Sequence, residues 1–162
     1  MSEPRVLRVA LADTSAVFTD PDASYTVPVG AGTLAAMIAG DPPKPEELTN
    51  AIGIFMDHIE DVTREVPGST FADSVALHGA GLQALVDTFE GRPSPLPFVF
   101  DRDSAEEIYR TLATETVAQR RLNPGLPADE VHHILGVACA VVATMRALQI
   151  IELTIATEEA AG

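Results

Sequence analysis

The chain of 162 residues is long enough for one domain with a sizeable core, and its 24 acidic residues against 10 basic ones give a formal net charge of −14. This charge argues against binding to nucleic acid or to an anionic membrane surface, because both require a basic face. A polyanionic ligand would need a local basic patch or a divalent cation to bind.

Three short strands are predicted near the N-terminus, where β-branched and apolar residues are frequent. Turn signals separate them at Ala12-Asp13-Thr14 and at Asp20-Pro21-Asp22. Because both turns are tight, we expect the three strands to be antiparallel neighbours. They cover residues 5–11, 16–19 and 24–29.

A long helix is predicted between Pro45 and Val66. Pro45 suits the first helical position, and Pro67-Gly68 ends the pattern. One apolar stripe runs along the segment in steps of three and four residues, which is the spacing of a single buried helix face. The stripe consists of Leu48, Ile52, Phe55, Ile59, Val62 and Val66.

The rest of the chain alternates strands with helices. A strand from Ser74 to His78 leads into the turn Gly79-Ala80-Gly81, and a Pro-rich loop spans residues 91–97. The sequence after Ile134 is apolar nearly all round, which predicts a central helix. The remaining predicted elements are helices at 82–89, at 104–121 (opened by a Ser104/Glu107 capping box) and at 127–148, and a final strand at 150–156.

Five segments resemble consecutive parts of one protein family. The first, residues 27–48, reads V-P-V-G-A-G-T-L-A-A-M-I-A-G-D-P-P-K-P-E-E-L. It is similar to a segment early in the second lobe of the exopolyphosphatases and guanosine pentaphosphatases (Ppx/GppA), which are two-lobed enzymes of the actin-like phosphotransfer superfamily. Four further segments resemble later parts of the same lobe, in the same order: residues 75–82, 119–127, 134–148 and 151–155.

The resemblance covers nearly the whole chain and implies an α/β fold. We expect a single ribonuclease-H-like (actin-like) lobe, with a mixed five-stranded sheet flanked by helices. Residues 1–162 would form one domain, equivalent to the C-terminal lobe of an exopolyphosphatase. The first lobe, which carries the general base glutamate of the family, is expected to be missing.

The family's phosphate loop departs from its pattern here. Actin-like enzymes hold phosphate with Asp-x-Gly-Gly-Gly-Ser between the first two strands of this lobe, because glycines let backbone N–H groups approach phosphate oxygens. This chain has Ala10-Leu11-Ala12-Asp13-Thr14-Ser15 at that place. The acidic residue and the three glycines are absent, and Asp13 adds a negative charge that would repel phosphate.

The candidate ligand-binding residues lie in the two turns that follow strands. By family position they are Thr14 and Ser15 in the first turn, with His78, Gly79, Ala80 and Gly81 in the second. His78 ends a strand just before a helix, which is where ligands bind in α/β sheets. A glycine turn that only joins strand to helix is the preferred explanation of the second group.

Three other features involve residue types that can bind metals, form ion pairs or act as nucleophiles. His133 and Asp129 share a helix face and could hold a metal, but no third ligand has suitable spacing, so a structural role is favoured. His58 and Asp61 have the spacing of a surface ion pair. Cys139, the only cysteine, lies in an apolar run and is interpreted as a core residue.

Two functions follow from the resemblance. The first is a non-catalytic binding or regulatory module, with a possible phosphate-containing ligand and no cofactor. The second is a phosphohydrolase acting on polyphosphate or pppGpp, with Mg²⁺ and an active site completed by a second subunit or lobe. For this second function Arg120 or Arg121 would be the nearest basic residue by family position.

The sequence predicts a cytoplasmic protein. It has a single cysteine, and its first twenty residues show no leader pattern. No apolar run reaches the ~18 residues of a membrane span. The apolar segments 134–142 and 96–100 would need to be covered, which predicts a homodimer or a partner protein.

Overall fold

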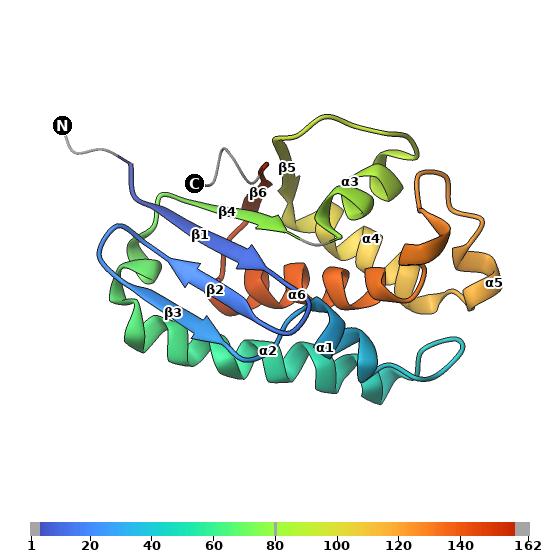
Figure 1. Ribbon diagram of the computed structural model, residues 1–162, viewed down its shortest axis with the longest axis horizontal. Coiled ribbons are helices and arrows are strands. Elements are labelled where there is room, and N and C mark those ends of the chain that lie inside the picture. Colours follow the sequence, from blue (N-terminus) through green and yellow to red (C-terminus); the bar gives the residue numbers. More distant parts are fainter. Residues whose placement is uncertain (1–3, 80, 158–162) are drawn as a thin grey trace.

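A computed structural model describes residues 4–79 and 81–157 of the chain (Figure 1). Its centre is a six-stranded sheet with the order β3-β2-β1-β4-β6-β5. The strands are β1 (Val6–Leu11), β2 (Ala16–Thr19), β3 (Ser24–Val27), β4 (Ser74–Gly79), β5 (Phe98–Asp101) and β6 (Glu152–Ile155). β1 is parallel to β4, and β4 to β6, while the β1–β2, β2–β3 and β5–β6 pairs are antiparallel. The predicted mixed sheet of an α/β fold is therefore confirmed.

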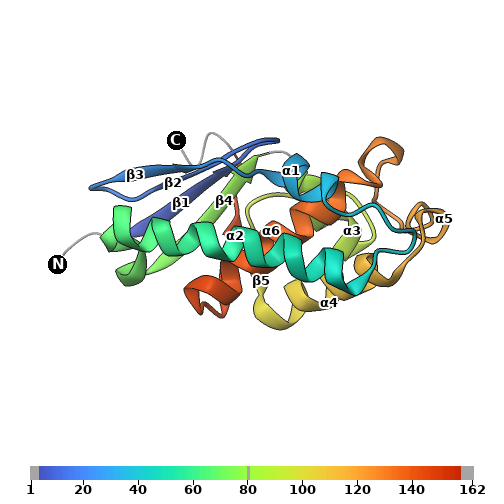
Figure 2. The same ribbon diagram turned by 90° about the horizontal axis from the view of Figure 1, so that it is seen from below.

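The helices connect these strands. They are α1 (Ala31–Ala36), α2 (Pro45–Glu65), α3 (Leu82–Glu90), α4 (Arg102–Thr114), α5 (Val117–Arg120) and α6 (His133–Leu148), with short 3-10 turns at Pro67–Phe71 and Ala128–Glu130. Figure 2 shows β1, β2 and β3 as one layer, with α2 and α6 on the same side of it. Side chains of β1 alternate accordingly, with Leu7, Val9 and Leu11 buried in the core beneath the sheet.

The sixth strand, β5, corrects the predicted count of five. Its four residues directly follow the predicted Pro-rich loop, and the sequence analysis did not separate them from it. β5 is an edge strand that pairs with β6 alone, from Phe98 opposite Ile155 to Asp101 opposite Glu152. Proline at 97 is tolerated because it precedes the paired residues.

Helix α2 has the predicted stripe and the predicted Pro45 at its first position. Five of the six stripe residues are buried and Leu48 packs against them. The carboxylate of Glu47 accepts hydrogen bonds from the backbone N–H groups of Ala39, Gly40 and Lys44, which joins the preceding loop to the helix start. These bonds lower the pKa of Glu47.

Helix α6 is central, as predicted, and is buried at every position from Ile134 to Met145. It packs against α1, α2, α3 and α4. The apolar run 134–142 is therefore covered by the chain's own elements, so the expectation that it needs an external partner was wrong. The helix also starts later than predicted, at His133, because Ala128–Glu130 forms a 3-10 turn after Pro127.

Three further boundaries differ from the sequence prediction. The helix expected at 104–121 is two helices, because Thr116 caps a new start at α5. The N-cap of α4 is Asp101, whose carboxylate accepts from the N–H of Ser104, and not Ser104 itself. Helix α1 has only six residues and was not predicted at all.

Two helical glycines allow a matched test of the α6–α1 contact. A Cβ atom at Gly136 would lie 1.9 Å from the carbonyl oxygen of Ala31, whereas one at Gly53 of α2 would meet nothing within 4 Å. We expect Gly136→Ala to destabilise the protein by about 1–3 kcal/mol through overpacking. Gly53→Ala should stabilise it by up to about 1 kcal/mol, because alanine favours the helix. Urea unfolding, monitored by circular dichroism, measures the free energy of unfolding of both variants. Equal changes in the two variants would contradict the close contact.

Candidate functional site

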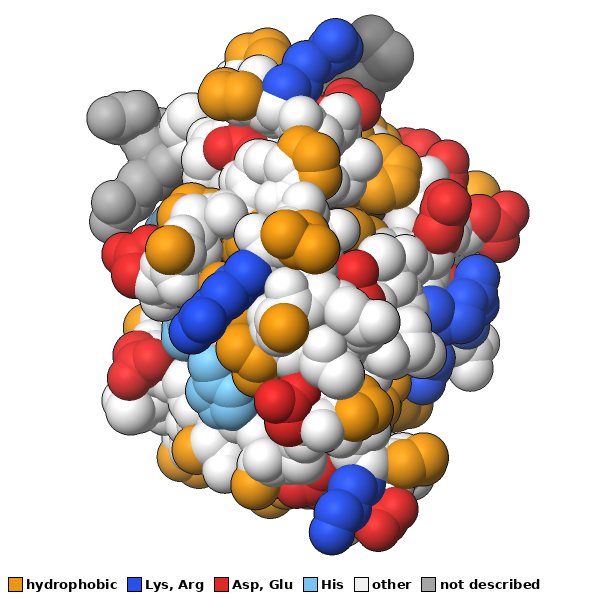
Figure 3. Space-filling view, turned by 90° about the vertical axis from the view of Figure 1, so that its right-hand side faces the viewer, with side chains coloured by type: hydrophobic (Ala, Val, Ile, Leu, Met, Phe, Trp, Pro, Cys, Tyr) orange, Lys and Arg blue, Asp and Glu red, His pale blue; other side chains and the backbone are white. Residues whose placement is uncertain are grey.

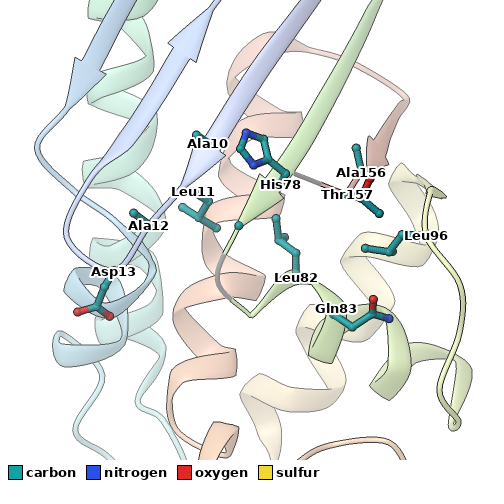
Figure 4. Close-up of a pocket in the computed structure, with 11 residues that line it drawn as sticks. Ala10, Leu11, Ala12, Asp13, His78, Leu82, Gln83, Leu96, Ala156 and Thr157 are labelled. Carbon is teal, nitrogen blue, oxygen red and sulfur yellow. The ribbon is translucent and has the colours of Figure 1, made fainter. Parts of the chain in front are cut away.

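The β1–β2 turn, the β4–α3 turn and the start of α6 converge at one end of the sheet (Figure 1). A cavity of about 540 Å³ opens there, at the carboxyl ends of the parallel strands β1 and β4. It is lined by Ala10, Leu11, Ala12, Asp13, His78, Gly79, Leu82, Gln83, Leu96, Ala156 and Thr157. Figure 4 shows His78 and Ala10 on neighbouring strands, with Asp13 at the outer end of the β1–β2 turn. The carboxyl edge of parallel strands is the usual place for a ligand in α/β folds.

The β1–β2 turn is held by helix α1. The N–H of Ala12 donates to the carbonyl of Ser15, which closes the turn. The carbonyl of Ala12 then accepts from Ala31, and the carbonyl of Asp13 accepts from Gly32 and Thr33. The N–H groups of the first turn of α1, which have no partner within the helix, thus donate to carbonyls of the β1–β2 turn. These hydrogen bonds fix the position of the β1–β2 turn relative to α1.

Gly30 and Gly32 make this contact sterically possible. A Cβ atom at Gly30 would lie 2.3 Å from the carbonyl oxygen of Ala12, and one at Gly32 would lie 1.9 Å from Oδ1 of Asp13. The Gly-x-Gly pair in the sequence therefore allows a close approach of two backbone segments. It also leaves room for the Asp13 carboxylate beside α1.

The second turn needs glycine for a different reason. Gly79 has φ 125° and Gly81 has φ 80°, a left-handed conformation that side chains rarely adopt. At Gly79 a Cβ atom would also come within 2.0 Å of the Leu11 carbonyl oxygen. The predicted glycine turn is therefore a backbone requirement, whatever its role in binding.

The predicted site residues are only partly brought together. His78 and Gly79 line the cavity, and Gly81 lies next to it, facing His133 and Val137. Thr14 is exposed and Ser15 half-buried, and neither is among the residues that line the cavity. Ala80, the remaining predicted residue, lies outside the described residues.

The sequence prediction missed most of the cavity wall. Leu82 and Gln83 come from the first turn of α3, and Ala156 and Thr157 follow β6. Leu96 lies between two prolines in the predicted loop. Nothing in the local sequence marks these positions, because each reaches the cavity only through the sheet order.

The cavity carries little positive charge. Among the described residues that line it, Asp13 is the one acidic side chain, and none is Lys or Arg. On the face shown in Figure 3, basic side chains are separated from one another by acidic and neutral ones and form no continuous patch. A polyanion would therefore meet a carboxylate here without a protein cation to offset it.

The side chain of His133 contacts two acidic residues. Its Nδ1 lies 3.0 Å from Oε2 of Glu130, and its Nε2 lies 3.6 Å from Oδ1 of Asp13. Asp129, which the sequence analysis considered with His133 as a metal ligand and did not favour, forms neither contact. Within residues 4–79 and 81–157, no group of three or more His, Cys, Asp or Glu side chains has an arrangement that would hold a metal ion.

Arg120 is a structural residue in this fold. Its side chain is 1% exposed, and its guanidinium donates to the carbonyls of Leu112, Val131 and Glu115 at 3.4, 3.0 and 2.9 Å. It is therefore not free to meet a phosphate, as the phosphohydrolase hypothesis had suggested. Arg121, the other candidate, is exposed.

Two smaller predictions are confirmed. Cys139 is fully buried, and burial raises the pKa of its thiol to about 12, so it is a core residue. Nδ1 of His58 lies 3.9 Å from Oδ2 of Asp61, as expected of a surface pair.

In the described part of the chain, no helix is long and apolar enough to cross a membrane.

Comparisons with known proteins agree on the fold. No protein-family model matches the chain, and no curated protein matches it. Among solved structures, an exopolyphosphatase-like protein superposes with a TM-score of 0.85 and 13% identity, over 94% of this chain and 54% of its own. A Ppx/GppA phosphatase of Aquifex aeolicus gives 0.80 and 16%, over 96% and 54%. An exopolyphosphatase of Cytophaga hutchinsonii gives 0.71 and 11%, over 97% and 54%.

The chain thus has the actin-like fold of one half of the Ppx/GppA structures. It spans about half the length of the solved structures that it matches. The resemblance seen in the sequence, to a single lobe of these proteins, is confirmed at the level of structure.

Replacing Arg120 tests its structural role against that of its exposed neighbour. Arg120→Met should lower the free energy of unfolding by roughly 2–4 kcal/mol, because it leaves buried carbonyl groups without donors. Arg121→Met should change it by less than about 0.5 kcal/mol. Urea unfolding of the two variants measures the difference, and a harmless Arg120→Met would contradict the assignment.

Proposed function

We propose that this chain is a ligand-binding or regulatory module with the fold of one half of a Ppx/GppA phosphatase, and that it does not hydrolyse phosphoanhydrides by itself. The composition of the cavity wall carries the proposal. Among the described lining residues, Asp13 contributes a carboxylate and no Lys or Arg is present. Phosphoryl transfer depends on cationic groups directed at the phosphate oxygens, and the described wall of this cavity has no cationic Lys or Arg side chain.

The cavity itself supports binding of a small ligand. Its volume of about 540 Å³ lies in the range of small-molecule sites. Leu11, Leu82 and Leu96 offer apolar contact, while His78 and Gln83 offer hydrogen bonds. A ligand with an apolar body fits this wall best, and a phosphate group on it would have to be accompanied by a divalent cation.

The alternative function is a phosphohydrolase on polyphosphate or pppGpp whose active site is completed by a second subunit. The observation that favours it is the coverage of about half of the matched structures. Catalytic groups would then come from another chain or from a second copy facing the open cavity. A homodimer remains a proposal, resting on the edge strand β5, where Val99 is 54% exposed.

Phosphate release from polyphosphate and from pppGpp, with Mg²⁺ present, tests the proposed function. We expect no release above the protein-free rate at any protein concentration, because the cavity has no cationic side chain to stabilise the transferred group. Turnover that is abolished by His78→Ala or Asp13→Ala would overturn the proposal. Turnover that rises more steeply than linearly with protein concentration would favour the alternative.

Light scattering at micromolar concentration tests self-association. A homodimer returns twice the chain mass of 17.1 kDa. Val99→Asp places a charge on the exposed edge of β5 and should return the protein to the monomer if that edge is the interface. A wild-type mass of 17.1 kDa would exclude an active site shared between two stable copies.

A further inference from the structure

We propose that His133 and Asp13 bind a divalent transition-metal ion of the Zn²⁺ class, with Glu130 orienting the histidine. The three residues come from different segments: Asp13 from the β1–β2 turn, Glu130 from the 3-10 turn, and His133 from the first position of α6. The fold brings them together beside the cavity, which Asp13 also lines.

The contact with Glu130 determines which ring nitrogen can be a ligand. Oε2 of Glu130 lies 3.0 Å from Nδ1 of His133, a hydrogen-bond distance. A carboxylate accepts hydrogen bonds, so the N–H is on Nδ1, and in the neutral ring the lone pair is on Nε2. A histidine that donates to a carboxylate in this way is the common arrangement of metal-binding histidines, because it fixes the ring and increases its basicity.

Nε2 of His133 faces a negative group. Oδ1 of Asp13 lies 3.6 Å from Nε2. This is longer than the ~2.7–3.2 Å of an N–H···O hydrogen bond. Two ligand atoms bound to one tetrahedral Zn²⁺ at ~2.1 Å lie about 3.4 Å apart, so the observed separation is close to what a shared ion requires.

Two glycines give the ligand side chains their room. A Cβ atom at Gly32 would lie 1.9 Å from Oδ1 of Asp13, and one at Gly81 would lie 3.2 Å from Nδ1 of His133. The side chains themselves are accessible from solvent, with 22% of His133 and 74% of Asp13 exposed. An ion can therefore reach the pair without rearrangement of the backbone.

The ligand set predicts an open site for particular ions. Two protein ligands leave the other positions of a tetrahedral ion for water or for an oxygen of a bound molecule. An imidazole nitrogen favours Zn²⁺, Co²⁺ or Ni²⁺, whereas Mg²⁺ prefers oxygen ligands. The site should accordingly discriminate between Zn²⁺ and Mg²⁺.

Isothermal titration of the untagged chain with Zn²⁺ tests the proposal without any other ligand. We expect one Zn²⁺ site, at least about tenfold weaker binding in His133→Gln and in Asp13→Asn, and about tenfold weaker binding in Glu130→Gln. The matched control is His58→Gln, which removes a histidine that also lies beside an aspartate, on α2, and should leave Zn²⁺ binding unchanged. Mg²⁺ should give no heat that depends on His133.

A second readout keeps the test valid if one variant fails to fold. Co²⁺ bound in place of Zn²⁺ should produce a visible absorption band that Asp13→Asn removes, and Asp13 is exposed enough for this variant to fold. Absence of Zn²⁺ binding to the wild-type chain would overturn the proposal. Equal Zn²⁺ affinity of wild type, His133→Gln and Asp13→Asn would also overturn it, because the ion would then bind elsewhere.

Discussion

The close contact between α6 and α1 at Gly136 determines the geometry of the site. A side chain at this position would collide with the Ala31 carbonyl, so the two helix backbones are in close contact there. Helix α6 is also buried among α2, α3 and α4, so it cannot shift to relieve a larger residue. Its first residue, His133, is thereby fixed relative to α1, and α1 in turn holds the β1–β2 turn. One helix separation thus sets the position of His133 relative to Asp13.

The hydrogen bonds of the β1–β2 turn differ from those of a phosphate loop. A phosphate loop points backbone N–H groups at its ligand. Here the N–H of Ala12 is used inside the turn, and the carbonyls of Ala12 and Asp13 are directed at α1. The Asp13 carboxylate is also exposed at this turn, with Nε2 of His133 near it. This combination attracts a cation and repels a free phosphate.

Much of the fold follows from periodicity in the sequence, and the site does not. The α2 stripe and the apolar run of α6 could be predicted because each pattern repeats over several turns within one segment. Helix α1 could not, because six residues are too few for a helical period to develop. Strand β5 could not, because it directly follows a loop with three prolines and has no turn signal of its own. The contact of His133 with Asp13 joins distant segments, so helical spacing suggested Asp129 instead. Pairing of this kind depends on the sheet order, which no local pattern encodes.

The negative charge of the chain affects both the cavity and the neighbouring His133–Asp13 pair. With a net charge of −14 and no lining Lys or Arg among the described residues, the cavity gains nothing from the protein's own field when an anion approaches. A divalent ion held between His133 and Asp13 would neutralise the carboxylate and present open positions at the cavity edge. A ligand oxygen could then coordinate the ion where an ordinary phosphate loop would offer N–H groups. The acidic surface would in that case assist binding indirectly, because it attracts the cation on which an anionic ligand depends.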